Sequence, residues 1–197
     1  MNATIFAPAT ALGKAGVAVV RISGPQSLQA VDQMTSVQNP IPRKAVLSEV
    51  HTLDGMPIDE ALIIFFPMPN SFTGENVVEF QTHGGRAITA ILLNELAKID
   101  GFRPAERGEF TRRAVENGKM DLTAAEGLAD LIDAETEQQR RQALRQMNGA
   151  LAQIYERWHG DLKHVLAWME AYIDFPEEEI PDNVSAEVRD KIIFLKE

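Results

Sequence analysis

The 197-residue chain contains no cysteine. This absence excludes disulfide bonds, zinc sites built from thiolates and a cysteine nucleophile. Long apolar runs are also missing, because no stretch approaches the roughly 20 apolar residues that a membrane-spanning helix needs. The N-terminus lacks a basic segment followed by a long apolar run, so the sequence predicts no signal peptide. We therefore expect a soluble protein with a cytoplasmic location.

Several catalytic motifs are absent as well. The segment "THGG" is similar to the oxyanion loop of esterases, but the chain has no G-x-S-x-G nucleophile motif. Gly118 and Lys119 resemble the end of a phosphate-binding loop. However, Arg113 stands where that loop needs its first glycine, and Met120 stands where it needs Ser or Thr. The four histidines do not have the spacing of metal ligands.

Acidic residues outnumber basic ones, giving a formal net charge of −10. This excess argues against non-specific nucleic-acid binding by the whole surface. Residues 174–182 carry five acidic side chains and no basic one, whereas residues 103–119 carry five basic and three acidic side chains. Charge alone favours a solvated amphipathic surface for residues 103–119, with a local anion site as the alternative.

The first part of the chain mixes short β-branched segments with helical ones. The pattern predicts strands at residues 15–23, 44–53, 60–66 and 76–82, and helices at 27–35 and 86–99. Ser27 is the expected N-cap of the first helix. The second helix has an apolar stripe formed by Ile88, Ile91, Leu92, Leu96 and Ile99. Strands joined mostly by hairpins, with helices inserted, predict an α+β fold with a mixed sheet and flanking helices.

The second part is predicted to be all-α. Residues 122–175 include no proline and three glycines, and apolar residues recur at helical spacing. A break is expected near residues 133–138, where Asp133 or Thr136 caps a new helix. The apolar positions are Ala125, Ala129 and Ile132, followed by Leu151, Ile154, Trp158, Val165, Met169 and Tyr172. A further helix is expected at 185–197, and the chain stops inside it, which suggests part of a longer protein.

We therefore predict two domains, at residues 1–120 and 121–197. The second is expected to hold long antiparallel helices and to be truncated.

Two charged side chains fall on predicted strands. Alternation places Glu79 on the face opposite to Val78 and Phe80, so its carboxylate lines a polar surface. Arg21 lies on a strand with two apolar faces, which predicts a central position in the sheet. A buried arginine needs a partner, because an unpaired buried charge costs several kcal/mol, roughly. Glu79 or a bound anion would serve, and a purely structural ion pair is the alternative.

Lys119 follows a predicted short helix in "GEFTRRAVENGKMD". Gly118 is expected to end that helix in the left-handed conformation. The ammonium group of Lys119 would then project from a fixed loop, which suits contact with a carboxylate or phosphate. The alternative is a surface lysine that compensates the helix dipole.

Three longer motifs occur in order along the chain: "TIFAPATALGKAGVAVVRISG", "PNSFTGENVVEFQTHGG" and "RGEFTRRAVENGKMDLTAAEGLADLIDA". Together they resemble the N-terminal region of the MnmE (TrmE) family of tRNA modification GTPases. The helical residues up to "AYIDFPEEEI" are also similar to the family's helical domain. The chain departs from the family at Asn76, Arg107 and Val115, where Asp, Pro and Phe are usual.

The resemblance implies a fold and a ligand for residues 1–120. The family's N-terminal domain is similar to the tetrahydrofolate-binding domains of aminomethyltransferase-like enzymes. It forms a homodimer and binds a one-carbon folate such as 5-formyltetrahydrofolate. The positions that match the family's folate contacts are Arg21, Glu79 and Lys119. A carboxylate can accept paired N–H donors of a pterin ring, and Arg or Lys can meet carbonyl or glutamate oxygens.

The resemblance also implies what the intact protein does. With the FAD-dependent partner MnmG, the family adds an aminomethyl or carboxymethylaminomethyl group to C5 of the wobble uridine of certain tRNAs. GTP, magnesium and potassium act in a GTPase domain whose motifs this sequence lacks, so we expect no GTP hydrolysis by this chain.

Two other functions remain open at this point. The chain could be a self-sufficient folate-dependent one-carbon transferase, with His83 or Glu79 as the general base. It could also be a structural dimerisation scaffold that binds no folate.

Overall fold

A computed structural model describes residues 3–11, 13–174 and 191–193 of the chain. The chain divides into two compact units, Met1–Met120 and Asp121–Glu197. The helix expected at residues 185–197 is described only at 191–193, which are helical. The acidic stretch at 174–182 lies outside the described residues beyond Asp174.

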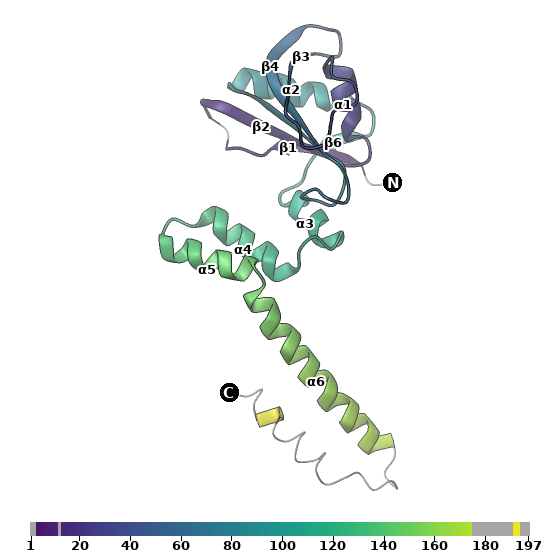
Figure 1. The fold of residues 1–197 in the computed structure, drawn as a ribbon, viewed down its shortest axis with the longest axis vertical. Coiled ribbons are helices and arrows are strands. Elements are labelled where there is room, and N and C mark those ends of the chain that lie inside the picture. Colours follow the sequence, from purple (N-terminus) through teal and green to yellow (C-terminus); the bar gives the residue numbers. More distant parts are fainter. Residues whose placement is uncertain (1–2, 12, 175–190, 194–197) are drawn as a thin grey trace. The chain divides into compact units, whose positions relative to one another are not determined.

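The first unit is built on a six-stranded sheet (Figure 1) with the strand order β3-β4-β5-β2-β1-β6. The pair β1–β6 is parallel and every other neighbouring pair is antiparallel, so the sheet is mixed. The predicted α+β class is therefore confirmed, and β2 has the predicted central position. The strands are β1 Thr4–Pro8, β2 Ala15–Ser23, β3 Val46–His51, β4 Pro57–Phe66, β5 Val77–Gly84 and β6 Phe102–Pro104.

Helices α1 (Ser27–Met34) and α2 (Arg86–Leu96) cover one face of this sheet (Figure 1). Alternate residues of the central strands point into the core between the sheet and these helices. Val78 and Phe80, which were predicted to share one face, are both fully buried. The two helices contribute apolar side chains to the same core. These are Ala30, Val31, Met34, Leu92 and Leu96.

Two details of the helix predictions were wrong. Ser27 is not the N-cap of α1, because Gln26 holds that position and its backbone N–H donates to Thr4 Oγ1 at 3.0 Å. This bond connects the start of α1 to β1, and the N-cap residue Gln26 makes no side-chain capping bond. Ile91 is 43% exposed and lies off the buried stripe of α2, while Thr89 and Glu95 are buried instead.

The opposite face of the sheet is not covered by α1 or α2, and we call it the open face. It carries Arg21 and Glu79, two of the predicted ligand contacts. Residues directly opposite one another in an antiparallel pair point to the same face. The strand registers place Glu79 opposite both Arg21 and Ile64, and Arg21 opposite Ala7. One row of side chains therefore crosses four strands of this face, with a carboxylate and a guanidinium at its centre.

The second unit is helical, with α4 (Leu122–Asp133), α5 (Glu137–Met147) and α6 (Ala150–Asp174). The predicted break is confirmed at Thr136, whose hydroxyl accepts from Gln139 N in a capping box. A second break at Gly149, with φ of 85°, was not predicted.

The helix predicted from Ala125, Ala129 and Ile132 is confirmed, but these residues do not form its buried face. Ala124 and Gly127 are the buried positions, whereas Ile132 is 76% exposed. Gly127 lies so close to α5 that an added Cβ would come within 2.7 Å of Met147 N. This close approach decides which face of α4 is buried.

Much of the apolar stripe predicted for α6 is exposed. Val165 is buried, but Ile154, Trp158 and Met169 are between 38% and 52% exposed. The side chain of Tyr172 lies outside the part of the chain that the structure describes. Among the described residues, no helix is both long enough and apolar enough for a membrane crossing.

Candidate ligand site on the open face of the sheet

Arg21 and Glu79 form an ion pair at the centre of the open face. Both Nε and Nη2 of Arg21 lie 2.9 Å from Glu79 Oε1. The two side chains are 27% and 14% exposed, so the pair is accessible from solvent but mostly desolvated. Of the two partners expected for Arg21, the structure supplies the carboxylate. Glu79 keeps its second oxygen, Oε2, for further hydrogen bonds.

Two phenyl rings flank the Arg21 guanidinium, and the sequence analysis did not identify either. The Cζ atom of Arg21 lies 5.2 Å from the ring centroid of Phe72 and 5.9 Å from that of Phe110. Both distances fall in the range of a cation–π contact. Phe72 follows the turn-forming residue Ser71, and Phe110 follows the charged residue Glu109, in a chain with few aromatic residues. These neighbours are the signal in the sequence that could have revealed the two rings.

Lys119 is held against the loop that carries Phe72. Helix α3 (Glu109–Glu116) ends in a Schellman motif, in which Gly118 N donates to Val115 O and Lys119 N donates to Ala114 O. Gly118 has φ of 66°, as predicted. A Cβ added to Gly74 would lie 3.2 Å from Lys119 Cγ, so the aliphatic stem of Lys119 passes directly over this glycine.

The structure therefore brings only two of the three predicted residues into direct contact. Arg21 and Glu79 share an ion pair, and Lys119 joins them through the loop at residues 71–75. Asn76, one of the departures from the family, accepts a hydrogen bond from Met68 N at 3.0 Å through its side-chain oxygen.

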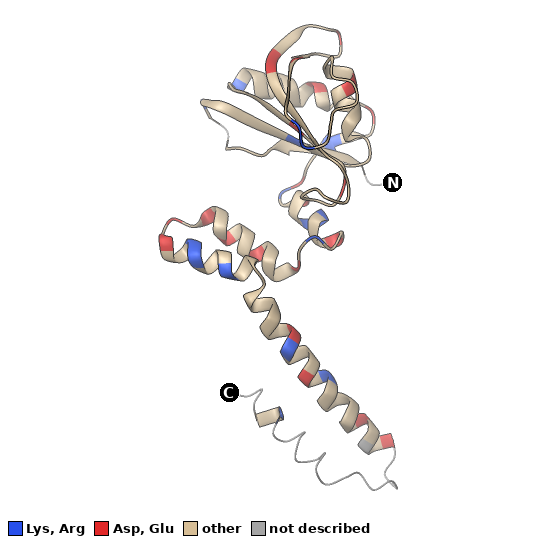
Figure 2. Ribbon diagram, viewed as in Figure 1, with Lys and Arg blue, Asp and Glu red and all other residues tan. Residues whose placement is uncertain are grey.

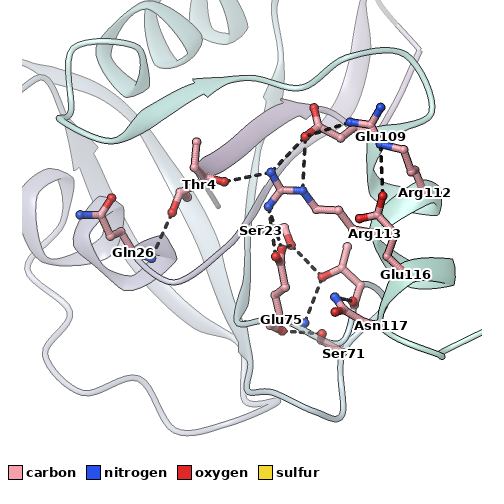
Figure 3. A network of polar contacts seen from close by, with 12 residues as sticks. Thr4, Ser23, Gln26, Ser71, Glu75, Glu109, Arg112, Arg113, Glu116 and Asn117 are labelled. Atoms are coloured by element: carbon pink, nitrogen blue, oxygen red, sulfur yellow. Dashed lines mark hydrogen bonds and ion pairs between the residues drawn. The ribbon is translucent and has the colours of Figure 1, made fainter. Parts of the chain in front are cut away.

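A buried charge network fastens the same loop to α3 (Figure 3). Arg113 Nη1 lies 3.0 Å from Glu75 Oε2, and Arg113 Nη2 lies 3.0 Å from Glu109 Oε1. Arg113 Nη2 also donates to the carbonyl of Ala3 at 2.9 Å. On the other side, Ser23 Oγ donates to Glu75 Oε2 at 2.7 Å.

Glu109 is the most buried charge of this network, at 1% exposure. Hydrogen bonds from Arg103 lower its pKa to about 2, against the opposing effect of burial, with further help from Glu106 N and Arg113. Acidic and basic residues interleave on α3 in Figure 2. The solvated surface favoured for residues 103–119 was therefore wrong for Glu109 and Arg113. Their buried charges are neutralised within the network, by Arg103 and Glu75 as well as by each other.

His83, proposed as a general base, is paired at the end of β5. Its Nδ1 lies 2.8 Å from Asp59 Oδ1, and its backbone N–H donates to Asp59 Oδ2 at 2.7 Å. Burial raises the pKa of Asp59, but these hydrogen bonds outweigh burial and leave that pKa below its usual value. The described residues include no cluster of His, Asp or Glu that could hold a metal ion.

Comparison with known proteins assigns both units. The family model "GTP-binding protein TrmE N-terminus" matches residues 4–119, and the model "MnmE helical domain" matches residues 122–197. These matches define the class, namely the N-terminal and helical regions of a GTP-binding protein.

Individual relatives agree. The chain is 54% identical to "tRNA modification GTPase MnmE" of Parvibaculum lavamentivorans over 98% of its own length and 44% of the relative's. It is 54% identical to the protein of the same name from Phenylobacterium zucineum, over 96% of this chain and 42% of the relative. For the Rickettsia typhi protein the identity is 51%, over 94% of this chain and 42% of the relative. The chain therefore belongs to the MnmE family of tRNA modification GTPases, and spans less than half the length of these curated relatives.

Proposed function

We propose that this chain binds a one-carbon tetrahydrofolate, such as 5-formyltetrahydrofolate, on the open face of its sheet. Arg21, Glu79 and Lys119 are the proposed contacts. The observation that carries the proposal is the Arg21–Glu79 pair, which is solvent-accessible and flanked by two phenyl rings. An ion pair built only for stability would need neither partial exposure to solvent nor the aromatic flanks.

The chemistry of these residues fits a reduced folate. A pterin ring presents adjacent N–H donors, which a carboxylate can accept as a pair, and Glu79 is held rigidly by Arg21. The phenyl rings of Phe72 and Phe110 offer apolar surface to the flat ring system of the ligand. The ammonium group of Lys119 suits the carbonyl or carboxylate oxygens at the far end of a folate.

Membership of the MnmE family supports a second proposal, which concerns an intact protein that contains such a chain. We propose that the intact protein modifies C5 of the wobble uridine in tRNA together with the FAD-dependent partner MnmG. In this proposal the present chain supplies the folate site and the homodimer contact. GTP, magnesium and potassium act in a separate GTPase domain.

The test of the folate site is a titration with 5-formyltetrahydrofolate, followed by difference absorbance. We expect Glu79→Gln to lower the affinity by about tenfold to a hundredfold, the range for losing a charge-assisted hydrogen bond. Glu49→Gln is the matched control, because Glu49 is an exposed strand carboxylate and the charge change is the same. Equal affinities for the two variants would refute the assignment of Glu79.

The self-sufficient transferase is the second candidate, and turnover separates it from a binding module. We expect no loss of the one-carbon group from the folate when the chain is incubated alone, because His83 lies four residues beyond Glu79 on β5, roughly 13 Å along the strand. Catalytic conversion of the folate without GTP or a partner protein would favour the transferase.

A further inference from the structure

The two phenyl rings on Arg21 come from segments far apart in the sequence. Phe72 belongs to the loop at residues 71–75, and Phe110 belongs to the first turn of α3. Neither segment is part of the sheet that carries Arg21. Something must therefore hold both segments at a fixed distance from the sheet, or the rings would not both meet the guanidinium.

Arg113 connects these two segments. Its guanidinium contacts Glu75, three residues after Phe72, and Glu109, the residue before Phe110. Figure 3 shows the side chain extending from α3 between the two carboxylates. The Arg113 side chain is 5% exposed, so this is a buried bridge rather than a surface ion pair. A planar guanidinium can serve both carboxylates at once, which a lysine ammonium does less well.

Other contacts fasten the same loop to the same neighbours. Asn117 Nδ2 donates to Thr73 O at 2.7 Å, so the C-terminal end of α3 also holds the loop. Ser23 Oγ lies 2.7 Å from Thr73 Oγ1 and connects the loop to β2, two residues beyond Arg21. The loop, α3 and the strand of Arg21 are thereby connected by side chains other than the three proposed ligand contacts.

We propose that Glu75 and Arg113 are positioning residues for the ligand site. Their bridge holds Phe72 and Phe110 against Arg21 and thereby fixes the Arg21–Glu79 pair in the orientation that receives the ligand. The bridge itself does not touch the ligand. The claim that this orientation matters for folate binding rests on the proposed function. The claim that the bridge positions Arg21 does not.

Nuclear magnetic resonance of the free protein tests the effect on Arg21 directly. The Nε–H of Arg21 donates to Glu79 and lies beside two rings, so its resonance reports both contacts. We expect Glu75→Gln to move this resonance in the same direction as Phe72→Leu does. The exposed pair Arg112–Glu116 on the same helix supplies the matched control, and Glu116→Gln should leave the resonance in place.

A binding titration with 5-formyltetrahydrofolate completes the test. We expect Glu75→Gln and Arg113→Lys to weaken binding about tenfold while Glu116→Gln binds like the wild type. Glu75→Gln keeps the shape of the side chain, so it decides the question even if Arg113→Lys fails to fold. An unmoved Arg21 resonance in folded Glu75→Gln protein would overturn the proposal, as would unchanged folate affinity in that variant.

The two failures are distinguishable. If the wild type binds no folate but the Arg21 resonance moves in Glu75→Gln, the proposed function fails while the bridge is shown to position Arg21. If the wild type binds folate and the resonance stays in place, the proposed function survives and the bridge is not a positioning device.

Discussion

Glu109 is a carboxylate that stays ionised although its side chain is almost fully buried. Arg103 and Arg113 both donate to it, and the backbone N–H of Glu106 adds a third donor. Removing such a charge from water is costly, and only this set of partners offsets the cost. The free energy of unfolding should therefore depend on the protonation of Glu109.

This dependence has a definite sign. The pKa of Glu109 is about 2 in the folded chain, below the reference value of 4.5. The unfolded chain therefore binds the proton more readily, and stability from this group is complete above pH 4.5 and lost as the pH falls toward 2. A lowering from 4.5 to about 2 corresponds to about 3 kcal/mol.

We expect denaturant unfolding between pH 5 and pH 2.5 to show this loss, within the usual acid range of carboxylates. In Glu109→Gln the slope of stability against pH should be smaller over the same range, because the titrating group is gone. Its overall stability at neutral pH should be lower, since two arginines lose a charged partner. An identical slope in the two proteins would show that Glu109 does not titrate as described.

At the residue scale, strand alternation could predict the Arg21–Glu79 site but not the network beside it. A period of two separates Glu79 from Val78 and Phe80 on its own strand. The register between β2 and β5 then places Arg21 directly opposite Glu79 on the same face. Arg113 and Glu109 instead look like an ordinary charged pair four residues apart on a surface helix. Their burial depends on Glu75, which comes from a loop 38 residues earlier in the chain, and no local pattern encodes that contact.

At the scale of single elements, Gly74 is required for two separate reasons. Its φ is 79°, which favours glycine, and an added Cβ would lie 3.0 Å from Asn117 Cβ and 3.2 Å from Lys119 Cγ. The first reason concerns the backbone alone. The second concerns the position of Lys119, and so the proposed ligand site.

A matched pair of variants separates these reasons. Gly55 has a similar φ of 88°, but an added Cβ there would meet nothing within 4 Å. We expect Gly55→Ala and Gly74→Ala each to lose about 1 kcal/mol of stability from backbone strain. Only Gly74→Ala should also weaken the binding of 5-formyltetrahydrofolate, because it displaces the stem of Lys119. Equal folate affinity in both variants would argue against a role for Lys119.

The cap of α5 gives a prediction for the helical unit. Thr136 accepts from Gln139 N at 3.2 Å, and Gln139 Oε1 accepts from Thr136 N at 2.8 Å. We expect Thr136→Ala to reduce the stability of this unit by about 1 kcal/mol, the usual effect of losing an N-cap. Gln142→Ala, at an exposed position within the same helix, is the control and should change stability by less than about 0.5 kcal/mol. Circular dichroism during denaturation measures both, and equal losses would contradict the capping role.

Element boundaries could be predicted where the signal is local. The cap at Thr136 and the left-handed Gly118 were predicted because their signals lie within a few residues. The first residue of α1 was predicted, but its N-cap is Gln26 rather than Ser27, and Gln26 makes no side-chain capping bond that a local pattern could indicate. The buried face of α4 was missed because it is formed by small residues. Gly127 of α4 packs closely against Ala143 of α5, and this close helix packing rather than hydrophobicity selects both residues.

At the scale of the whole molecule, the two units match two successive family models. The motifs in the sequence were sufficient to identify the family, because three of them occur in order between Thr4 and Ala134 and the last continues into the second unit. The pairing of β1 with β6 is not a local property. It joins Phe6 to Pro104, nearly a hundred residues later in the chain.

Oligomeric state is a prediction at this scale. The family resemblance leads us to expect a homodimer of the present chain. Light scattering across a dilution series should give twice the mass of one chain at high concentration. A mass that stays at one chain throughout would refute the homodimer for this part of the protein.

The central claim is that the open face of the sheet is a folate site, and calorimetric titration with 5-formyltetrahydrofolate tests it most directly. The wild-type protein should bind the folate saturably. Glu79→Ala and Lys119→Ala, each shown to be folded, should bind it more weakly. Absence of binding heat at several temperatures in a folded wild-type protein, with no binding by equilibrium dialysis, would contradict the claim and favour a structural scaffold.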